Sequence, residues 1–293
     1  MVRLGVIRTS FATLALIGAR PVLAVPITLT GNVESDFPAK GSGVQVTPVL
    51  HDPLQVGESP FIPANGWVSG WAVRDIRSSY DANSDTLYIG IGALKNALGN
   101  PAIIGDADGN GDPGGASAAM ARAGGVDQPS LGGHKSVTVA FAADDPKHPG
   151  LPGTPVAVAG VPADKSTAGP GLDGFNVAAY KNNPTGIEDN YGKTLAANLG
   201  ALAFDPSASH PGFEFTIKNF SKIPGLNPAS GFWISLYAGS TDDVIAGEAT
   251  HPLTRVPSLA QQTITPEPAT LLPWTFVAGT AWFSLRRRAR RGR

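Results

Sequence analysis

One short stretch combines acidic residues, an asparagine and glycines at a spacing suited to binding a hard cation. It reads Asp106-Ala-Asp108-Gly-Asn110-Gly-Asp112 and follows the apolar pair Ile103-Ile104 after one glycine. Calcium ions take six to eight oxygen ligands, and side chains at alternate positions of a tight loop can converge on one ion. Asp106, Asp108 and Asn110 stand at such alternate positions, and the glycine after Asn110 permits the sharp turn that the loop needs.

The stretch resembles the first half of the calcium loops of EF-hand and dockerin proteins, which begin D-x-[DN]-x-[DN]-G. The resemblance covers seven residues only. An EF-hand requires a glutamate at the twelfth position, where this chain has Ser117, and the Pro-Gly-Gly run at 113–115 prevents an immediate second helix. We therefore predict a calcium loop that joins β-elements, with Asp112 as a fourth oxygen donor and Asp127 as the remote carboxylate that closes the shell.

A turn of this composition also forms without any ion, because Asp and Asn side chains accept hydrogen bonds from the nearby backbone. Calcium is favoured over this alternative because three carboxylates packed so tightly repel one another unless a cation neutralises them. The predicted cofactor is therefore calcium. The predicted ligands are Asp106, Asp108, Asn110, Asp112 and Asp127.

No catalytic constellation is visible in the sequence. The five histidines are scattered, and no two have the spacing of zinc ligands. Cysteine is absent, which excludes thiolate chemistry and disulfides, and there is neither a G-x-S-x-G elbow nor a phosphate-binding loop. Two glycosidase carboxylates from separate strands would leave no mark in sequence spacing. We expect a protein that is not an enzyme, with a glycan hydrolase as the weaker alternative.

Four aromatic residues offer a different chemistry, the stacking of sugar rings: Trp67, Trp71, Tyr88 and Trp233. A row of such rings exposed on one sheet would make a carbohydrate-binding module. Aromatic residues in strands more often belong to the core. A carbohydrate-binding module is therefore the alternative to a structural or adhesive protein, and the exposure of these rings separates the two.

The elements that position these residues are predicted to be β-strands. The 36 glycines and 26 prolines are spread as turns, and long helical periodicity is missing between residues 25 and 265. The fold class is all-β, an antiparallel β-sandwich or jelly-roll-like body with long loops. Strands are predicted at 27–33, 44–50 (an edge strand, because of its proline), 67–76, 86–91, 136–141, 155–159, 174–179, 212–219 and 231–237, with a turn at 81–85 and one short helix at 116–123.

The two ends of the chain have the composition of targeting signals. Residues 1–24 begin with arginines, continue through a short apolar run and end at Ala24, the pattern of a signal peptide cleaved there by signal peptidase. Residues 269–285 carry no ionisable side chain and are just long enough for one transmembrane helix. The arginines that follow would hold that end in the cytoplasm. They are Arg286, Arg287, Arg288, Arg290, Arg291 and Arg293.

The tripeptide Pro266-Glu267-Pro268 precedes the apolar run, and its prolines keep it extended and accessible outside the membrane. The tripeptide, the apolar run and the terminal arginines together resemble the PEP-CTERM sorting signal of exopolysaccharide-producing Gram-negative bacteria. The resemblance covers about a tenth of the chain. It implies that an exosortase, a membrane-embedded protease, cleaves the signal at the inner membrane. The protein would then reach the outer surface or the extracellular matrix.

These signals divide the chain into a signal peptide at 1–24, an exported β-rich domain at 25–251, a linker at 252–265 and the sorting signal at 266–293. Outside 1–24 and 269–293 there remain 13 basic and 23 acidic residues, a net charge of −10. An acidic body argues against nucleic acid, whose binding depends on cationic contacts to phosphate. We expect an exported, calcium-stabilised, non-catalytic protein with a structural or adhesive role in the exopolysaccharide or biofilm.

Overall fold

A computed structural model describes most of the middle of the chain. The residues described are 27–40, 43–49, 59–124, 127, 131–132, 135–163, 174–183, 186–240 and 248–259. The predicted signal peptide at 1–24 and the sorting signal at 266–293, with its apolar run, lie outside these residues. Within them, no helix has the length and apolar character needed to cross a membrane.

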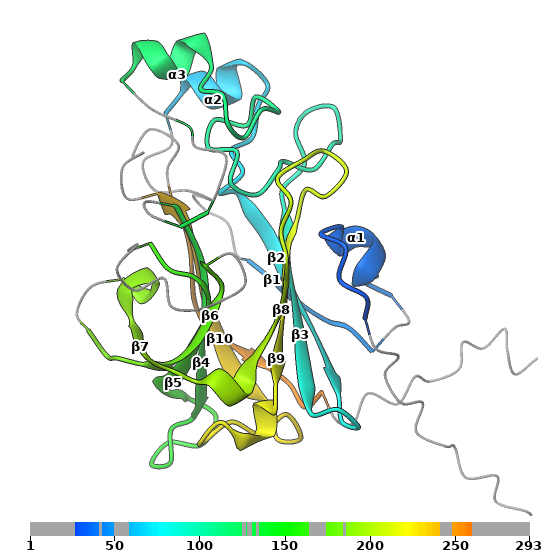
Figure 1. The fold of residues 1–293 in the computed structure, drawn as a ribbon, viewed down its shortest axis with the longest axis vertical. Helices are drawn as coiled ribbons and strands as arrows, with labels where there is room; N and C mark the ends of the chain where they lie inside the picture. Colours follow the sequence, from blue (N-terminus) through cyan, green and yellow to red (C-terminus); the bar gives the residue numbers. More distant parts are fainter. Residues whose placement is uncertain are drawn as a thin grey trace, which may run out of the picture.

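The described chain is mostly β-structure with a few short helices (Figure 1). In chain order the elements are α1 (Val33–Asp36), β1 (Gln45–Pro48), α2 (Phe61–Ala64), β2 (Val73–Asp81), β3 (Thr86–Ala93), α3 (Ala118–Arg122), β4 (Lys135–Asp144), β5 (Pro152–Val161), β6 (Asn176–Tyr180), η2 (Ile187–Asp189), β7 (Tyr191–Thr194), η3 (Ala196–Asn198), β8 (Leu199–Ala203), β9 (Phe213–Lys218), η4 (Phe220–Lys222), β10 (Phe232–Ser240) and β11 (Ala249–Val256).

The strands form two antiparallel sheets that face each other (Figure 1). The first sheet has the order β1-β2-β3-β9-β8, and the second has the order β11-β10-β4-β5-β6-β7. This arrangement agrees with the predicted all-β sandwich. The predicted hairpin is present as β2 and β3, and β1 is an edge strand as its proline indicated. The helices α2 and α3 lie at one end of the sandwich (Figure 1).

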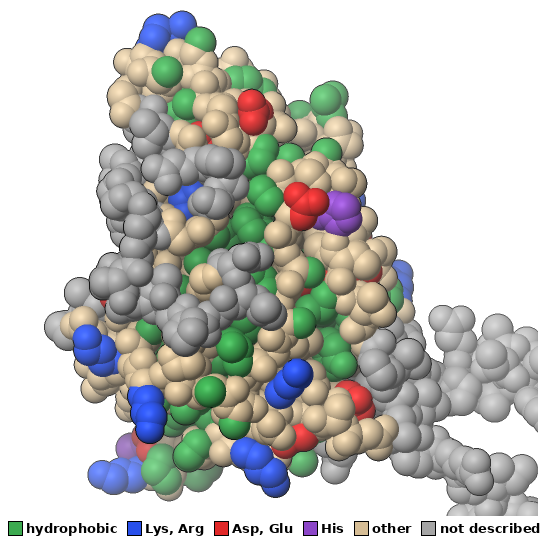
Figure 2. All heavy atoms as spheres, viewed as in Figure 1, with side chains coloured by type: hydrophobic (Ala, Val, Ile, Leu, Met, Phe, Trp, Pro, Cys, Tyr) green, Lys and Arg blue, Asp and Glu red, His purple; other side chains and the backbone are tan. Residues whose placement is uncertain are grey.

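One large core lies between the sheets because apolar residues alternate along the strands. Phenylalanines from the second sheet and from η4, which follows β9, meet in it: the ring centroid of Phe220 lies 5.7 Å from that of Phe141 and 5.0 Å from that of Phe232. Figure 2 shows hydrophobic side chains along the middle of one face, between the two sheets. Fully buried core residues include Ile76, Leu87, Ile89, Ile91, Val137, Val139, Phe213, Phe215, Ile217 and Ile234.

The predicted first strand at 27–33 is wrong, because this segment belongs to neither sheet. The segment lies on the outer face of the first sheet, where the N–H groups of Thr30 and Gly31 donate to Glu214 Oε2 at 3.0 and 2.8 Å. Val33 then fits over Gly90 and Gly212, where added Cβ atoms would come within 3.2 and 2.5 Å of it. The segment therefore packs on a sheet rather than pairing within one.

The segment 27–37 also buries the outward-facing Glu214 of β9. The alternation of Phe213, Phe215 and Ile217 with Glu214 and Thr216 predicts a half-buried strand, yet Glu214 is 0% exposed and Thr216 is 6% exposed. Arg77 on β2 holds the segment 27–37 against the sheet. Its guanidinium donates to the carbonyl oxygen of Phe37 at 2.6 Å and pairs with Glu34 at 3.0 Å. The outer face of this sheet is thus a second, partly polar interior.

Two predicted boundaries are also wrong. The strand expected at 67–76 begins only at Val73, because residues 68–70 approach the acidic loop too closely to belong to a regular ladder. The linker expected at 252–265 begins inside β11, which pairs with β10, so the β-domain extends past residue 251. Val256 and Leu259 are buried in the core. The strands β7, β8 and β11 match none of the predicted strands, because β7 and β8 have only four and five residues and β11 contains a proline.

Candidate metal centre

The acidic stretch found in the sequence folds as a tight loop held against the segment that precedes β2. The N–H of Gly70 donates a hydrogen bond to the carbonyl oxygen of Asp106 at 2.7 Å. A Cβ atom at Gly70 would lie 2.0 Å from the carbonyl oxygen of Ile103, and one at Gly109 would lie 2.1 Å from that of Val68. Both positions require glycine, because a side chain would prevent the two backbones from approaching this closely.

Three aspartates converge at this loop. Asp106 and Asp108 belong to the loop itself, and Asp127 comes from the chain that follows α3. One carboxylate oxygen from each lies within 4.8 Å of the other two. Asp106 is 1% exposed and Asp108 is 0% exposed, and the side chain of Asp127 is also fully buried. Three buried carboxylates at this separation can hold a metal ion.

Backbone N–H groups orient the two loop carboxylates. Asp106 accepts hydrogen bonds from the N–H groups of Gly109 and Gly111, at 2.9 and 2.8 Å. Asp108 accepts from the N–H of Ser117 at 2.9 Å. Ser117 therefore does not take the place of the EF-hand glutamate as a ligand, but its backbone holds one of the candidate ligands while its hydroxyl accepts from Met120 to begin α3.

A cation of the protein itself contacts this group. Lys135, the first residue of β4, is 2% exposed, and its Nζ forms an ion pair with Asp127 Oδ1. The same Nζ donates to the carbonyl oxygen of Gly105 at 2.6 Å and lies 5.7 Å from the centre of the Trp71 ring. Asp127 Oδ2 accepts from the N–H of Ala107 at 3.2 Å. When all three carboxyls and the amine are ionised, the cluster carries two net negative charges.

Burial raises the pKa values of two of these carboxyl groups. It raises the pKa of Asp106 from 3.8 to about 6, and the neighbouring charge of Asp108 adds to this effect. It raises the pKa of Asp127 from 3.8 to about 7, although the positive charge of Lys135 acts in the opposite direction. A bound divalent cation would lower both values, because it stabilises the ionised carboxylates.

Two of the five predicted ligands have other roles in the loop. The amide of Asn110 donates to the carbonyl oxygen of Gly115 and accepts from the N–H of Asp112, both at 2.6 Å. Asp112 is exposed, accepts from the N–H of Gly114 at 3.3 Å, and does not belong to the converging group. The structure therefore brings together Asp106, Asp108 and Asp127, and places Asn110 and Asp112 in the adjoining turn.

Lys135 is the member of this site that sequence reasoning did not identify. It stands eight residues after Asp127 and matches no motif for binding or catalysis. Its one signal is that it begins the apolar strand β4, where a charged side chain must find a buried partner or lie at the surface.

The four aromatic residues do not form a row on one sheet, because Trp67 precedes β2 and belongs to no strand, and the other three are spread over the core and both sheets. Trp71 is 0% exposed and belongs to the core. Tyr88 lies on β3 of the first sheet, whereas Trp233 lies on β10 of the second, and both are partly buried. The indole N–H of Trp233 donates to Asp144 Oδ1 at 2.8 Å, and Arg255 lies 5.6 Å from its ring centre. These positions disfavour the carbohydrate-binding alternative, which requires neighbouring exposed rings.

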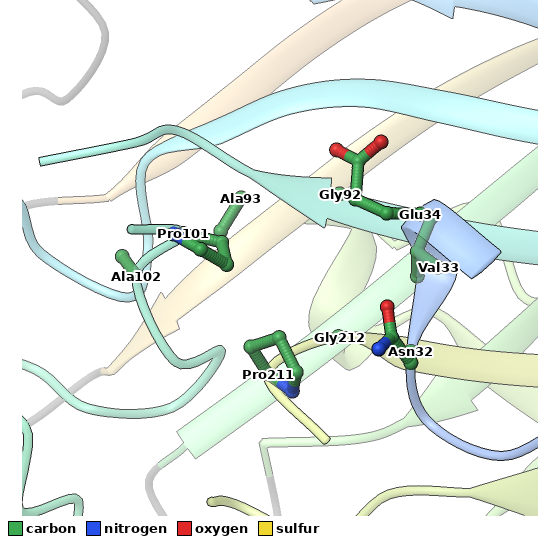
Figure 3. Close-up of a pocket in the computed structure, with 9 residues that line it drawn as sticks. All are labelled: Asn32, Val33, Glu34, Gly92, Ala93, Pro101, Ala102, Pro211 and Gly212. Atoms are coloured by element: carbon green, nitrogen blue, oxygen red, sulfur yellow. The ribbon is translucent and has the colours of Figure 1, made fainter. Parts of the chain in front are cut away.

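A small cavity lies where α1 meets the end of β3 and the segment before β9 (Figure 3). Its lining is mainly apolar or glycine, with Pro101 and Pro211 on one side. Glu34 is the one charged residue in this lining, and it is paired with Arg74 and Arg77. The two facing carboxylates that glycoside hydrolysis requires are therefore not found in this cavity.

Comparison of the chain with protein-family models, with curated proteins and with solved structures gives no match. The geometry of the site and the composition of the chain therefore indicate the function.

Proposed function

We propose that this protein is an exported, calcium-stabilised β-sandwich with a structural or adhesive role at the outer surface or in the extracellular matrix of a Gram-negative bacterium. The observation that carries the proposal is the convergence of Asp106, Asp108 and Asp127 in a buried position. Buried carboxylates are stable only when they are paired, protonated or bound to a metal. Lys135 neutralises one of the three, and a divalent cation neutralises the rest.

The choice of calcium rests on the chemistry of the donors. Among the residues that the structure describes, the donors of this group are all carboxylate oxygens and include no histidine, and such oxygens suit hard cations such as calcium. Extracellular calcium modules bind with dissociation constants of about 10⁻⁴ to 10⁻³ M, so a site with few charged ligands can still be filled outside the cell. Calcium stabilisation therefore fits an exported protein.

The export part of the proposal rests on the ends of the chain. The signal peptide ending at Ala24 and the Pro266-Glu267-Pro268 motif with its apolar run and arginines would bring the protein to signal peptidase and exosortase. The acidic body, with its net charge of −10 outside the two basic ends, suits an extracellular surface exposed to divalent cations and exopolysaccharide.

Isothermal titration calorimetry with calcium tests the metal. The wild-type protein is expected to bind one ion, and Asp108→Asn is expected to weaken binding at least about tenfold, since even partners outside the coordination shell contribute 10- to 100-fold. Asp112→Asn is the matched control, because Asp112 lies in the same loop but is exposed. Absence of binding at millimolar calcium, or equal losses in the two variants, would contradict the assignment.

A further inference from the structure

Lys135 and Asp127 form a contact that an ordinary ion pair explains poorly. Both side chains are almost fully buried, at 3% and 0% exposed, and Nζ of the lysine touches Oδ1 of the aspartate. Removing two opposite charges from water is costly, and the attraction between them recovers that cost only in part. The contact holds the amine nitrogen of Lys135 beside the carboxyl carbon of Asp127 and away from solvent.

We propose that Lys135 and Asp127 condense into an intramolecular isopeptide bond between Nζ and Cγ. The neutral amine attacks Cγ, and the new N–Cγ bond gives a tetrahedral intermediate. The nitrogen then loses a proton, the hydroxyl oxygen gains one, and the Cγ–O bond breaks to release one water molecule. No oxidant, reductant or second substrate is consumed. This modification goes beyond the proposed function, because it does not depend on export or on a bound cation.

The hydrogen bonds of the product are already in place around the reacting groups. The amide would keep one N–H on Nζ, which faces the carbonyl oxygen of Gly105 at 2.6 Å. It would keep one oxygen, and Asp127 Oδ2 already accepts from the N–H of Ala107 at 3.2 Å. That N–H also stabilises the negative oxygen of the tetrahedral intermediate. A buried amide with both polar groups paired is stable in this position.

The surroundings also supply the proton transfer and exclude water. A carboxylate oxygen of Asp106 lies within 4.8 Å of one from Asp127, which makes Asp106 the candidate to carry a proton from nitrogen to the departing oxygen once the groups close to hydrogen-bond distance. The Trp71 ring, 0% exposed, lies 5.7 Å from Nζ. Groups held in contact react with effective concentrations on the order of 10⁵ M or more, and exclusion of water opposes the reverse hydrolysis.

The isopeptide bond is also compatible with a cation at the same aspartates. Condensation removes one negative charge from Asp127 and one positive charge from Lys135, so the net charge of the cluster does not change. The ammonium that competes with a metal ion disappears, and the new amide still offers a carbonyl oxygen. Asp106 and Asp108 then supply the two negative charges that match one divalent ion.

Peptide mass spectrometry of the full-length protein, expressed and denatured, tests the bond. Trypsin does not cleave after a modified lysine, so the cross-linked protein is expected to yield the peptide 123–147 with the mass of one water molecule missing. Chymotrypsin then cleaves at Leu131, between the joined residues, and is expected to leave two chains held together through Lys135 and Asp127. Fragment ions locate the bond at these two residues without reliance on any variant.

Lys135→Arg is the matched control, because it keeps the positive charge but provides no amine that can form this bond. The water deficit and the branched peptide are expected to disappear in this variant. A cyclic imide at an aspartate would give the same deficit, but it would persist in Lys135→Arg and would leave no branched peptide. Ordinary tryptic cleavage after Lys135 in the wild-type protein, or a deficit that survives the substitution, would overturn the proposal. Calcium binding is measured separately, so either proposal can fail alone.

Discussion

The tertiary environment of Glu214 determines the pKa of its carboxyl group. It lies on β9 beneath the segment 27–37, and burial raises its pKa from 4.5 to about 8, while the N–H of Gly31 acts against this rise and the charge of Asp36 adds to it. The folded protein therefore keeps a proton on Glu214 between pH 4.5 and 8, whereas the unfolded chain loses it. Across that range the contribution of Glu214 to stability falls as the pH rises.

Glu214→Gln is expected to remove this part of the pH dependence. The glutamine oxygen can still accept from Thr30 and Gly31, but the side chain no longer ionises. The difference in unfolding free energy between the variant and the wild type should grow between pH 5 and 8 with a slope of up to about 1.4 kcal/mol per pH unit, in favour of the variant. Urea denaturation at several pH values measures it. Parallel pH profiles for the two proteins would show that Glu214 does not titrate in this range.

At the scale of elements, β11 differs most from what the sequence predicts. A stretch that contains Pro252 and Pro257 has the composition of a linker, yet β11 pairs with β10 from Phe232↔Val256 to Ala238↔Ala249. Its proline is tolerated because β11 is an edge strand, where one side of the backbone needs no partner within the sheet.

Shortening the chain shows whether residues 252–259 belong to the β-domain or to a linker. A protein that ends after Leu259 is expected to retain the stability of the β-domain. One that ends after His251 loses the buried side chains of Val256 and Leu259, each of which contributes about 1.5–3 kcal/mol, so its unfolding free energy should fall by at least about 3 kcal/mol. Equal midpoints of chemical denaturation for the two proteins would instead assign 252–259 to a linker.

At the scale of the whole molecule, the two ends and the β-domain have separate tasks in the proposed function. Replacing Pro266, Glu267 and Pro268 by alanines should let the preceding chain continue the apolar helix and deprive the exosortase of its extended substrate. The variant is expected to remain in the inner membrane with its arginines attached, as measured by fractionation and by the mass of the C-terminal peptide. Alanines at Gln261 and Gln262 provide the control. Surface release of the triple variant at the wild-type level would contradict the sorting role.

Much of the fold could be predicted from the sequence because local alternation reports burial directly. Phe213, Phe215 and Ile217 are all fully buried, as their spacing in β9 predicted, and the apolar run that became β4 was found in the same way. The spacing of Asp106 and Asp108 likewise placed two carboxylates on one tight loop. These are properties of neighbouring residues, and neighbours in sequence remain neighbours in any fold.

The burial of Glu214 and the contact between Lys135 and Asp127 depend on the tertiary structure. Glu214 is buried because a segment about 180 residues earlier covers its face of the sheet, and Lys135 meets Asp127 because β4 begins beneath the acidic loop. Sequence alternation distinguishes apolar from polar positions along one strand, but it carries no information about which distant segment will cover the polar ones. Such contacts depend on how the two sheets and their connections pack, and that packing is determined by the whole chain at once.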